Sequence, residues 1–294
     1  MIVMRSPQRR LTALLATLLA APLLASCGDL GTTHGRPTVV ASFYPLQYIA
    51  QQVAGDHEQV LNLTHPGMEP HDLELTVAQT ADIVDADVVV YESGFQPAVD
   101  TAVAQNQPVH VVDAAKVAGL QGDDPHFWLD PTRLSKVAAE FERQMRAADP
   151  AHAGDYASNL RGLQHRLTAL DREFRQGLAS CARRTVVVGH EAFAYLGRRY
   201  HLDVVPINGL SPDAEPSPAH IRQLQDLIRA RSITTVFTEQ LASPVLARTL
   251  ASDLGIRAAV LDPIEGLSAA TADQDYFSLM RHDLAALRKA NDCG

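Results

Sequence analysis

Two series of short, β-rich apolar runs, each alternating with amphipathic helical stretches, constrain the fold of this chain more than any other feature. The first series lies at 38–42, 59–63, 87–91 and 110–113, and the second at 185–189, 202–207, 235–238 and 258–261. Parallel strands need long crossover connections, which helices usually provide, so this alternation favours parallel sheets. The sequence therefore predicts an α/β protein of two lobes, each with a parallel sheet flanked by helices.

The stretch between the two series predicts one long helix. Apolar residues recur at steps of three and four from 151 to 180, among them Leu163, Leu167 and Leu170. About 28 residues at 1.5 Å each give a rod about 42 Å long, enough to run along both lobes. A coiled-coil partner is the alternative, but a stripe of only about four heptads between folded halves favours packing on its own lobes. We expect this helix to join an N-terminal lobe at 38–150 to a C-terminal lobe at 181–294 and to permit only modest lobe motion.

The N-terminus has the pattern of an export signal. Three arginines precede an apolar run at 11–24, and small residues then lead to Cys27. The segment around Cys27 resembles a bacterial lipobox, in which this cysteine becomes the acylated first residue. A transmembrane anchor is the alternative, but the run is shorter than the roughly 20 residues that a spanning helix needs. We expect a signal peptide at 1–26 and a lipidated tether at 27–37, which would hold an extracytoplasmic protein to the bacterial cell membrane.

Charge and cysteine content narrow the function classes. The formal net charge is −9, and the expected leader contains arginines but no acidic residue, so the mature chain is more acidic still. This balance argues against a nucleic-acid partner. Besides Cys27 the chain has only Cys181 and Cys293. An oxidising compartment favours a disulfide between them, and two free thiols are the alternative.

Four residues far apart in the sequence follow strand-like runs, where open α/β sheets usually bind ligands. They are His71, His126, His190 and Asp262. Each alone is more typical of a hydrogen-bonded loop or a turn. Together, three imidazoles and one carboxylate suit zinc, and four protein ligands leave no open position for a reactive water. The sequence therefore predicts a metal carrier, not an enzyme.

Three further residues are candidates for supporting roles. Glu191 and Glu239 also follow strand ends and could orient the imidazoles, with surface salt bridges as the alternative. His65 precedes the His71 loop and could stand near the metal as an alternative ligand or a gate.

Seven segments in the same order resemble the zinc- and manganese-binding lipoproteins of bacterial ABC importers, the cluster A-I solute-binding family. The segments lie at 42–46, 66–72, 124–131, 189–193, 209–217, 237–239 and 261–263. The resemblance implies a metal between two lobes, and delivery by a monomeric binding protein to a membrane permease with its ATPase. His71, His126, His190 and Asp262 fall on the four ligand positions. Histidine at the third position is typical of zinc members, whereas manganese members tend to have glutamate there, so Zn²⁺ is expected before Mn²⁺.

Other functions fit less well. A zinc hydrolase with an HExxH helix would need histidine at position 194, which is Ala194. A siderophore or vitamin binder would need a broad aromatic or basic cleft, and only 5% of the residues are aromatic. A surface adhesin remains an alternative, because lipidation would serve it equally well. The long His- and Asp-rich loop of many zinc members is missing between 114 and 124.

Overall fold

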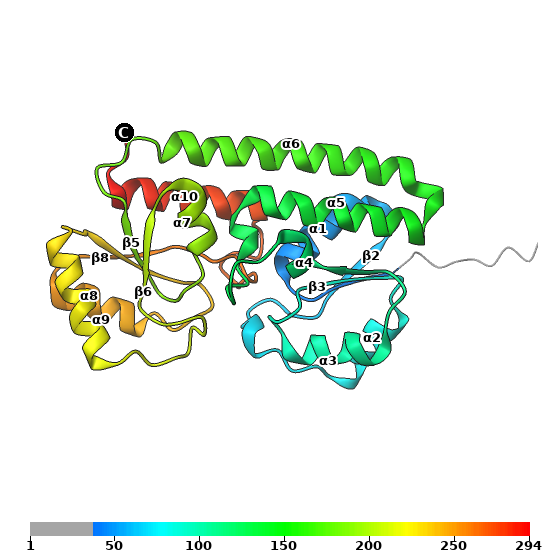
Figure 1. Cartoon of the computed structure of the whole chain (residues 1–294), viewed down its shortest axis with the longest axis horizontal. Helices are drawn as coiled ribbons and strands as arrows, with labels where there is room; N and C mark the ends of the chain where they lie inside the picture. The colour runs from blue at the N-terminus through cyan, green and yellow to red at the C-terminus, as the bar shows by residue number, and fades with distance from the viewer. Residues whose placement is uncertain (1–37) are drawn as a thin grey trace, which may run out of the picture. The chain divides into compact units, whose positions relative to one another are not determined.

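The computed structural model describes residues 38–294, which form two four-stranded parallel sheets (Figure 1). The strand orders are β2-β1-β3-β4 and β6-β5-β7-β8. In each sheet the second strand lies on one side of the first strand, and the third and fourth strands lie on the other side. A topological switch point therefore lies between β1 and β3 and another between β5 and β7. The strands are β1 (Thr38–Ala41), β2 (Gln59–Asn62), β3 (Val88–Tyr91), β4 (Val111–Asp113), β5 (Thr185–Val188), β6 (Asp203–Pro206), β7 (Thr235–Thr238) and β8 (Arg257–Val260).

All eight predicted strands are present, and the fold class is confirmed. The expected long helix is α6, which lies against α1, α5 and α10 (Figure 1). Its apolar stripe therefore packs on the protein's own helices. The helices are α1 (Tyr44–Ala54), α2 (Val77–Asp85), α3 (Pro97–Asn106), α4 (Ala114–Ala118), α5 (Pro131–Ala148), α6 (Ala153–Gly177), α7 (Ala194–Tyr200), α8 (Pro218–Ala230), α9 (Val245–Leu254) and α10 (Tyr276–Asn291).

The central strands β1, β3, β5 and β7 are buried on both faces, as continuous apolar strands require. Successive side chains point to opposite faces, so Val39 and Ala41 join one core while Val40 joins another. Likewise Val186 faces one core and Val187 the other. The first core is continuous through α1, α5, α6 and α10 and includes residues of both sheets. Because the two lobes share this core, large rotation of one against the other would expose apolar surface.

The predicted disulfide joins Cys181 to Cys293, beside the end of α6 and the end of α10. It closes a loop with a sequence separation of 112 residues. A loop of that length loses enough entropy in the unfolded chain to stabilise the fold by about 4 to 5 kcal/mol.

Within residues 38–294, no helix is long and apolar enough to cross a bilayer. The expected signal peptide, Cys27 and the tether at 27–37 lie outside the described residues.

Candidate metal centre

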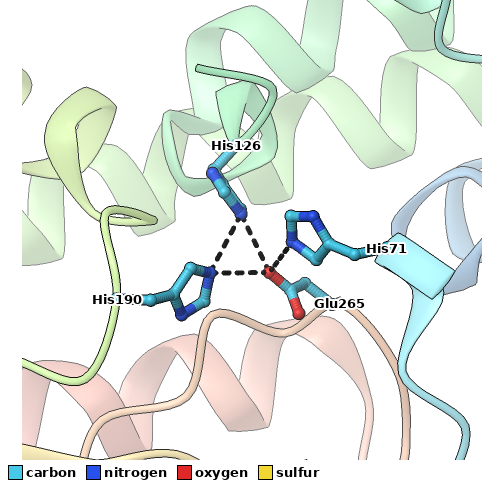
Figure 2. Close-up of side chains that lie close together, drawn as sticks. All are labelled: His71, His126, His190 and Glu265. Carbon is cyan, nitrogen blue, oxygen red and sulfur yellow. Dashed lines mark hydrogen bonds and ion pairs between the residues drawn. The ribbon is translucent and has the colours of Figure 1, made fainter. Parts of the chain in front are cut away.

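Four side chains from separate loops converge between the two sheets: His71, His126, His190 and Glu265 (Figure 2). His71 lies in a short 3₁₀ helix, Pro70–Asp72, whose first residue is a proline. His126 immediately precedes a second 3₁₀ helix, Phe127–Leu129. His190 comes two residues after β5, and Glu265 belongs to the loop that follows β8. Both lobes therefore contribute to one site.

The ligand atoms of this group have the spacing of a small coordination shell. Glu265 Oε1 lies 2.9 Å from His126 Nε2, 3.4 Å from His71 Nε2 and 3.4 Å from His190 Nε2. His126 Nε2 and His190 Nε2 are 3.3 Å apart. In a tetrahedral zinc site with bonds of about 2.0 to 2.1 Å, neighbouring ligand atoms are about 3.3 Å apart. The four distances above are close to this value, and all four ligand atoms lie within 4.8 Å of one another, so the donor set and its clustering suit zinc.

Two carboxylates contact the buried histidines at Nδ1, the ring nitrogen that faces away from the metal position. Asp124 Oδ1 accepts from the backbone N–H of His126 at 3.0 Å and lies 2.9 Å from its Nδ1. Glu239 accepts from the backbone N–H of His190 at 2.8 Å and lies 2.7 Å from its Nδ1. A proton on Nδ1 leaves Nε2 as the free lone pair, so both rings present the correct nitrogen to the metal position. Glu239, expected as a residue that could orient an imidazole, contacts the His190 ring in the structure.

His71 is held differently. Its backbone N–H donates to Glu69 Oε1 at 3.2 Å, and its ring packs edge-on against Phe95 with centroids 4.7 Å apart. Its side chain is 15% exposed, whereas those of His126 and His190 are at most 1% exposed. His71 is therefore the ligand position nearest to solvent.

Burial and charge act against each other in this group. Burial alone would raise the pKa of Glu265, but hydrogen bonds with the three histidines hold that pKa well below its ordinary value. Burial alone would lower the pKa of His190, but hydrogen bonds with Glu239 and Glu265 outweigh it and raise the pKa to about 10. Burial and the nearby Glu265 carboxylate raise the pKa of Glu69 to about 7. Without a metal, the site is therefore an ionised carboxylate facing a protonated imidazole.

The structure brings Glu265 to the three imidazoles, and not Asp262, the fourth expected ligand. Asp262 lies outside the group, because its Oδ1 turns back to accept from the Ile264 N–H at 2.9 Å, while its own N–H donates to Asp283 at 2.8 Å. Burial raises the pKa of Asp262 to about 7. The chain then passes through Ile264 with φ +58°, a conformation that a β-branched residue adopts only under constraint. This turn brings Glu265, with its longer side chain, to the three imidazoles.

Two other expected neighbours of the metal lie elsewhere. His65 is exposed and outside the group of four, and the Glu191 side chain is exposed at the start of the next loop. Sequence reasoning missed Glu265, Asp124 and Glu69. A signal for the last two was present, because an acidic residue, a proline and a histidine occur in that order at 69–71 and again at 124–126. In both triplets the acidic side chain accepts from the N–H of the histidine.

Hydrogen bonds between the lobes connect the loops that hold the ligands. Trp128 Nε1 donates to the Pro263 carbonyl at 2.7 Å, and Tyr276 Oη donates to the Trp128 carbonyl at 2.6 Å. The Gly67 N–H donates to the Leu267 carbonyl at 2.7 Å. These bonds tie the His71 and His126 loops to the Glu265 loop, so contacts within the protein hold three of the four candidate ligand positions together.

Comparison with known proteins assigns the chain to a family. A family model described as "Zinc-uptake complex component A periplasmic" (ZnuA) matches residues 39–290. The chain belongs to this family. It is 32% identical to the zinc-binding lipoprotein AdcA of Streptococcus pneumoniae over 97% of the chain, although it spans only 61% of the length of that relative. It is 30% identical to the high-affinity zinc uptake system protein ZnuA of Bacillus subtilis, over 90% of the chain and 93% of the relative.

Solved structures show the same two-lobe fold. The Zn(II)-bound ZnuA-like domain of Streptococcus pneumoniae AdcA superposes with a TM-score of 0.77 at 32% identity, covering 88% of this chain and all of the domain. The laminin-binding protein Lmb of Streptococcus agalactiae, described as having adhesin and metal-transporting activity, superposes with a TM-score of 0.78 at 28% identity. That match covers 86% of this chain and 99% of Lmb.

Gly189 allows Glu239 to reach the third histidine in this ZnuA-family chain. A Cβ atom at position 189 would lie 2.3 Å from Glu239 Oε1 and 2.9 Å from its Cδ. Gly189→Ala should therefore displace the carboxylate and remove both of its bonds to His190, which we expect to weaken zinc binding about 10- to 100-fold. Chelator-competition titration measures the loss. Gly209→Ala is the matched control, because a Cβ there meets nothing within 4 Å. Equal affinity in the two variants would refute the role of Glu239.

Proposed function

We propose that this chain is a zinc-binding protein that holds one Zn²⁺ with His71, His126, His190 and Glu265. The observation that carries the proposal is the convergence of three imidazole nitrogens on one carboxylate oxygen at 2.9 to 3.4 Å. Imidazole-rich sites favour zinc, whereas manganese prefers more oxygen ligands. Membership of the zinc-uptake family supports the same metal.

The zinc is cargo in this proposal and takes part in no reaction. Four protein ligands complete a tetrahedron, so no position is left where a catalytic water could bind. We infer that the chain delivers Zn²⁺ to the permease of an ABC importer driven by its ATPase, as the family description of a zinc-uptake complex suggests. Lipidation at Cys27 would keep a monomeric carrier on the extracytoplasmic side of the cell membrane, and relatives described as lipoproteins support this location.

A chelator-competition titration of the metal-stripped protein tests the metal assignment. We expect one equivalent of zinc to bind at neutral pH, with manganese weaker by at least about 100-fold, since each tenfold preference needs only 1.4 kcal/mol. Equal affinity for both metals would support a manganese-type carrier. The absence of stoichiometric binding of either metal would refute the carrier function.

Adhesion to host protein is a second candidate function. Lmb, which shares the fold, is described as both an adhesin and a metal transporter. Substituting the metal ligands separates the two functions, because it should abolish zinc uptake and leave surface adhesion unchanged.

A further inference from the structure

A pocket of about 520 Å³ beside the ends of α6 and α7 is lined by an unusual number of cationic side chains. They are Arg175, Arg184, Arg198 and Arg199, and His201 also lines the pocket. None of the residues that line this arginine pocket is acidic, although the whole chain has a formal net charge of −9. The pocket has no residue in common with the metal centre.

Carboxylates of the protein pair with three of the four arginines. Behind the pocket, Asp171 pairs with Arg175 at 2.6 Å and with Arg199 at 2.8 Å. The C-termini of α6 and α7 add about half a negative charge each. Asp130 also lies 3.8 Å from Arg199 and Asp124 lies 3.7 Å from Arg198, so Arg184 is the pocket arginine that has no carboxylate within 4.0 Å in the described part of the chain.

The other two arginines keep free hydrogen-bonding capacity. Arg184 donates to the Ala179 carbonyl at 2.8 Å, and no carboxylate in the described part of the chain lies within 4.0 Å of it. Arg198 stacks on the Tyr195 ring at 4.4 Å and approaches the Asp124 carboxylate only to 3.7 Å, beyond hydrogen-bond distance. Each guanidinium has five N–H donors in a planar fork, so most of the donors of these two residues remain available.

We propose that the arginine pocket binds a small phosphate-bearing anion. Arginine forks match phosphate oxygens in pairs, and a charge-assisted bond of this kind is stronger than a neutral hydrogen bond. The volume lies within the range of about 300 to 1,000 Å³ that is usual for small-molecule sites. A phosphate group would occupy only part of it, so the site suits a phosphate ester, whether free in solution or part of a lipid headgroup.

Calorimetric titration of the zinc-loaded protein with glycerol 3-phosphate tests the proposal. We expect one saturable site whose affinity falls as salt is added, and a loss of about tenfold or more in Arg184→Gln/Arg198→Gln. The charge-matched control is Arg222→Gln/Arg229→Gln on α8, which should bind like the unmodified protein. Equal affinity in the two double variants, or no saturable binding, would overturn the proposal.

Two further measurements keep the result interpretable. Arg184 also holds the end of α6, so the single variant Arg198→Gln, which breaks no hydrogen bond of the described structure, should itself weaken binding. Unchanged binding in this variant would contradict the site. Displacement of bound glycerol 3-phosphate by two competitors, inorganic phosphate and vesicles containing phosphatidylglycerol, then identifies the source of the anion. Displacement by phosphate but not by vesicles indicates a free ester, and displacement by vesicles indicates a lipid headgroup.

Discussion

Glu265→Ala should reduce zinc affinity by more than about 100-fold, because loss of a ligand should exceed the 10- to 100-fold loss typical of a residue that only supports one. All three imidazoles converge on Glu265 Oε1. Among the four ligand atoms that the described residues bring together, it is the one carboxylate oxygen, and the other three are imidazole nitrogens. Its removal leaves three imidazoles and opens the fourth position to water. Chelator-competition titration of the metal-stripped variant at neutral pH measures the effect.

Asp262→Asn is the control that distinguishes the proposed ligand, Glu265, from the expected one, Asp262. Asp262 lies in the same loop and is equally buried, but it is bonded to the Ile264 N–H. Its raised pKa of about 7 means that a neutral amide resembles a form it already adopts. We therefore expect zinc affinity to change by less than about threefold, within the usual range of a substitution that touches no ligand. A large loss in Asp262→Asn with a small one in Glu265→Ala would show that the loop rearranges and that Asp262 binds the metal.

The sequence was sufficient for the fold because its signals were local. Runs of valine at β3 and β5 have no polar alternation, which indicates strands covered on both faces. The stripe of Leu163, Leu167 and Leu170 predicted the long helix that joins the two halves. The shared core was not predictable in the same way, because it depends on which helix faces meet across the two lobes.

For the metal centre, residues directly after strands were easier to predict than residues set by a turn. His190 follows β5 almost directly, and its direction is fixed by the strand. Glu265 is placed by the bond from Asp262 to Ile264 and by the positive φ of Ile264. Aspartate before proline is a common turn former, and that local role is the one that Asp262 has here. The residue that forms the turn and the residue that the turn presents could not be distinguished without coordinates.

Zinc affinity should rise about tenfold for each pH unit between about pH 7 and 9, because a histidine ligand must lose its proton before it binds metal. In the metal-free protein the hydrogen bonds with Glu239 and Glu265 raise the pKa of His190 to about 10. His190 therefore carries a proton throughout this range, and each zinc ion displaces it. An unperturbed histidine, with a pKa near 6.5, would give a slope only below about pH 7.

The stability of the metal-free protein depends on pH in the opposite direction to zinc affinity. A pKa raised in the folded, metal-free protein contributes stability that is complete below about pH 6.5 and is lost as pH rises towards 10. The melting temperature gained on zinc binding should therefore increase with pH.

Calorimetry at pH 8 in buffers of different ionisation enthalpy counts the protons released. Glu239→Gln removes the first of the two carboxylates that raise the pKa of His190, so it should flatten the dependence of zinc affinity on pH above pH 8. The control is His165→Asn at an exposed histidine, which should leave this dependence unchanged. If affinity did not depend on pH between 7 and 9, the proposed exchange of a proton for zinc at His190 would be wrong.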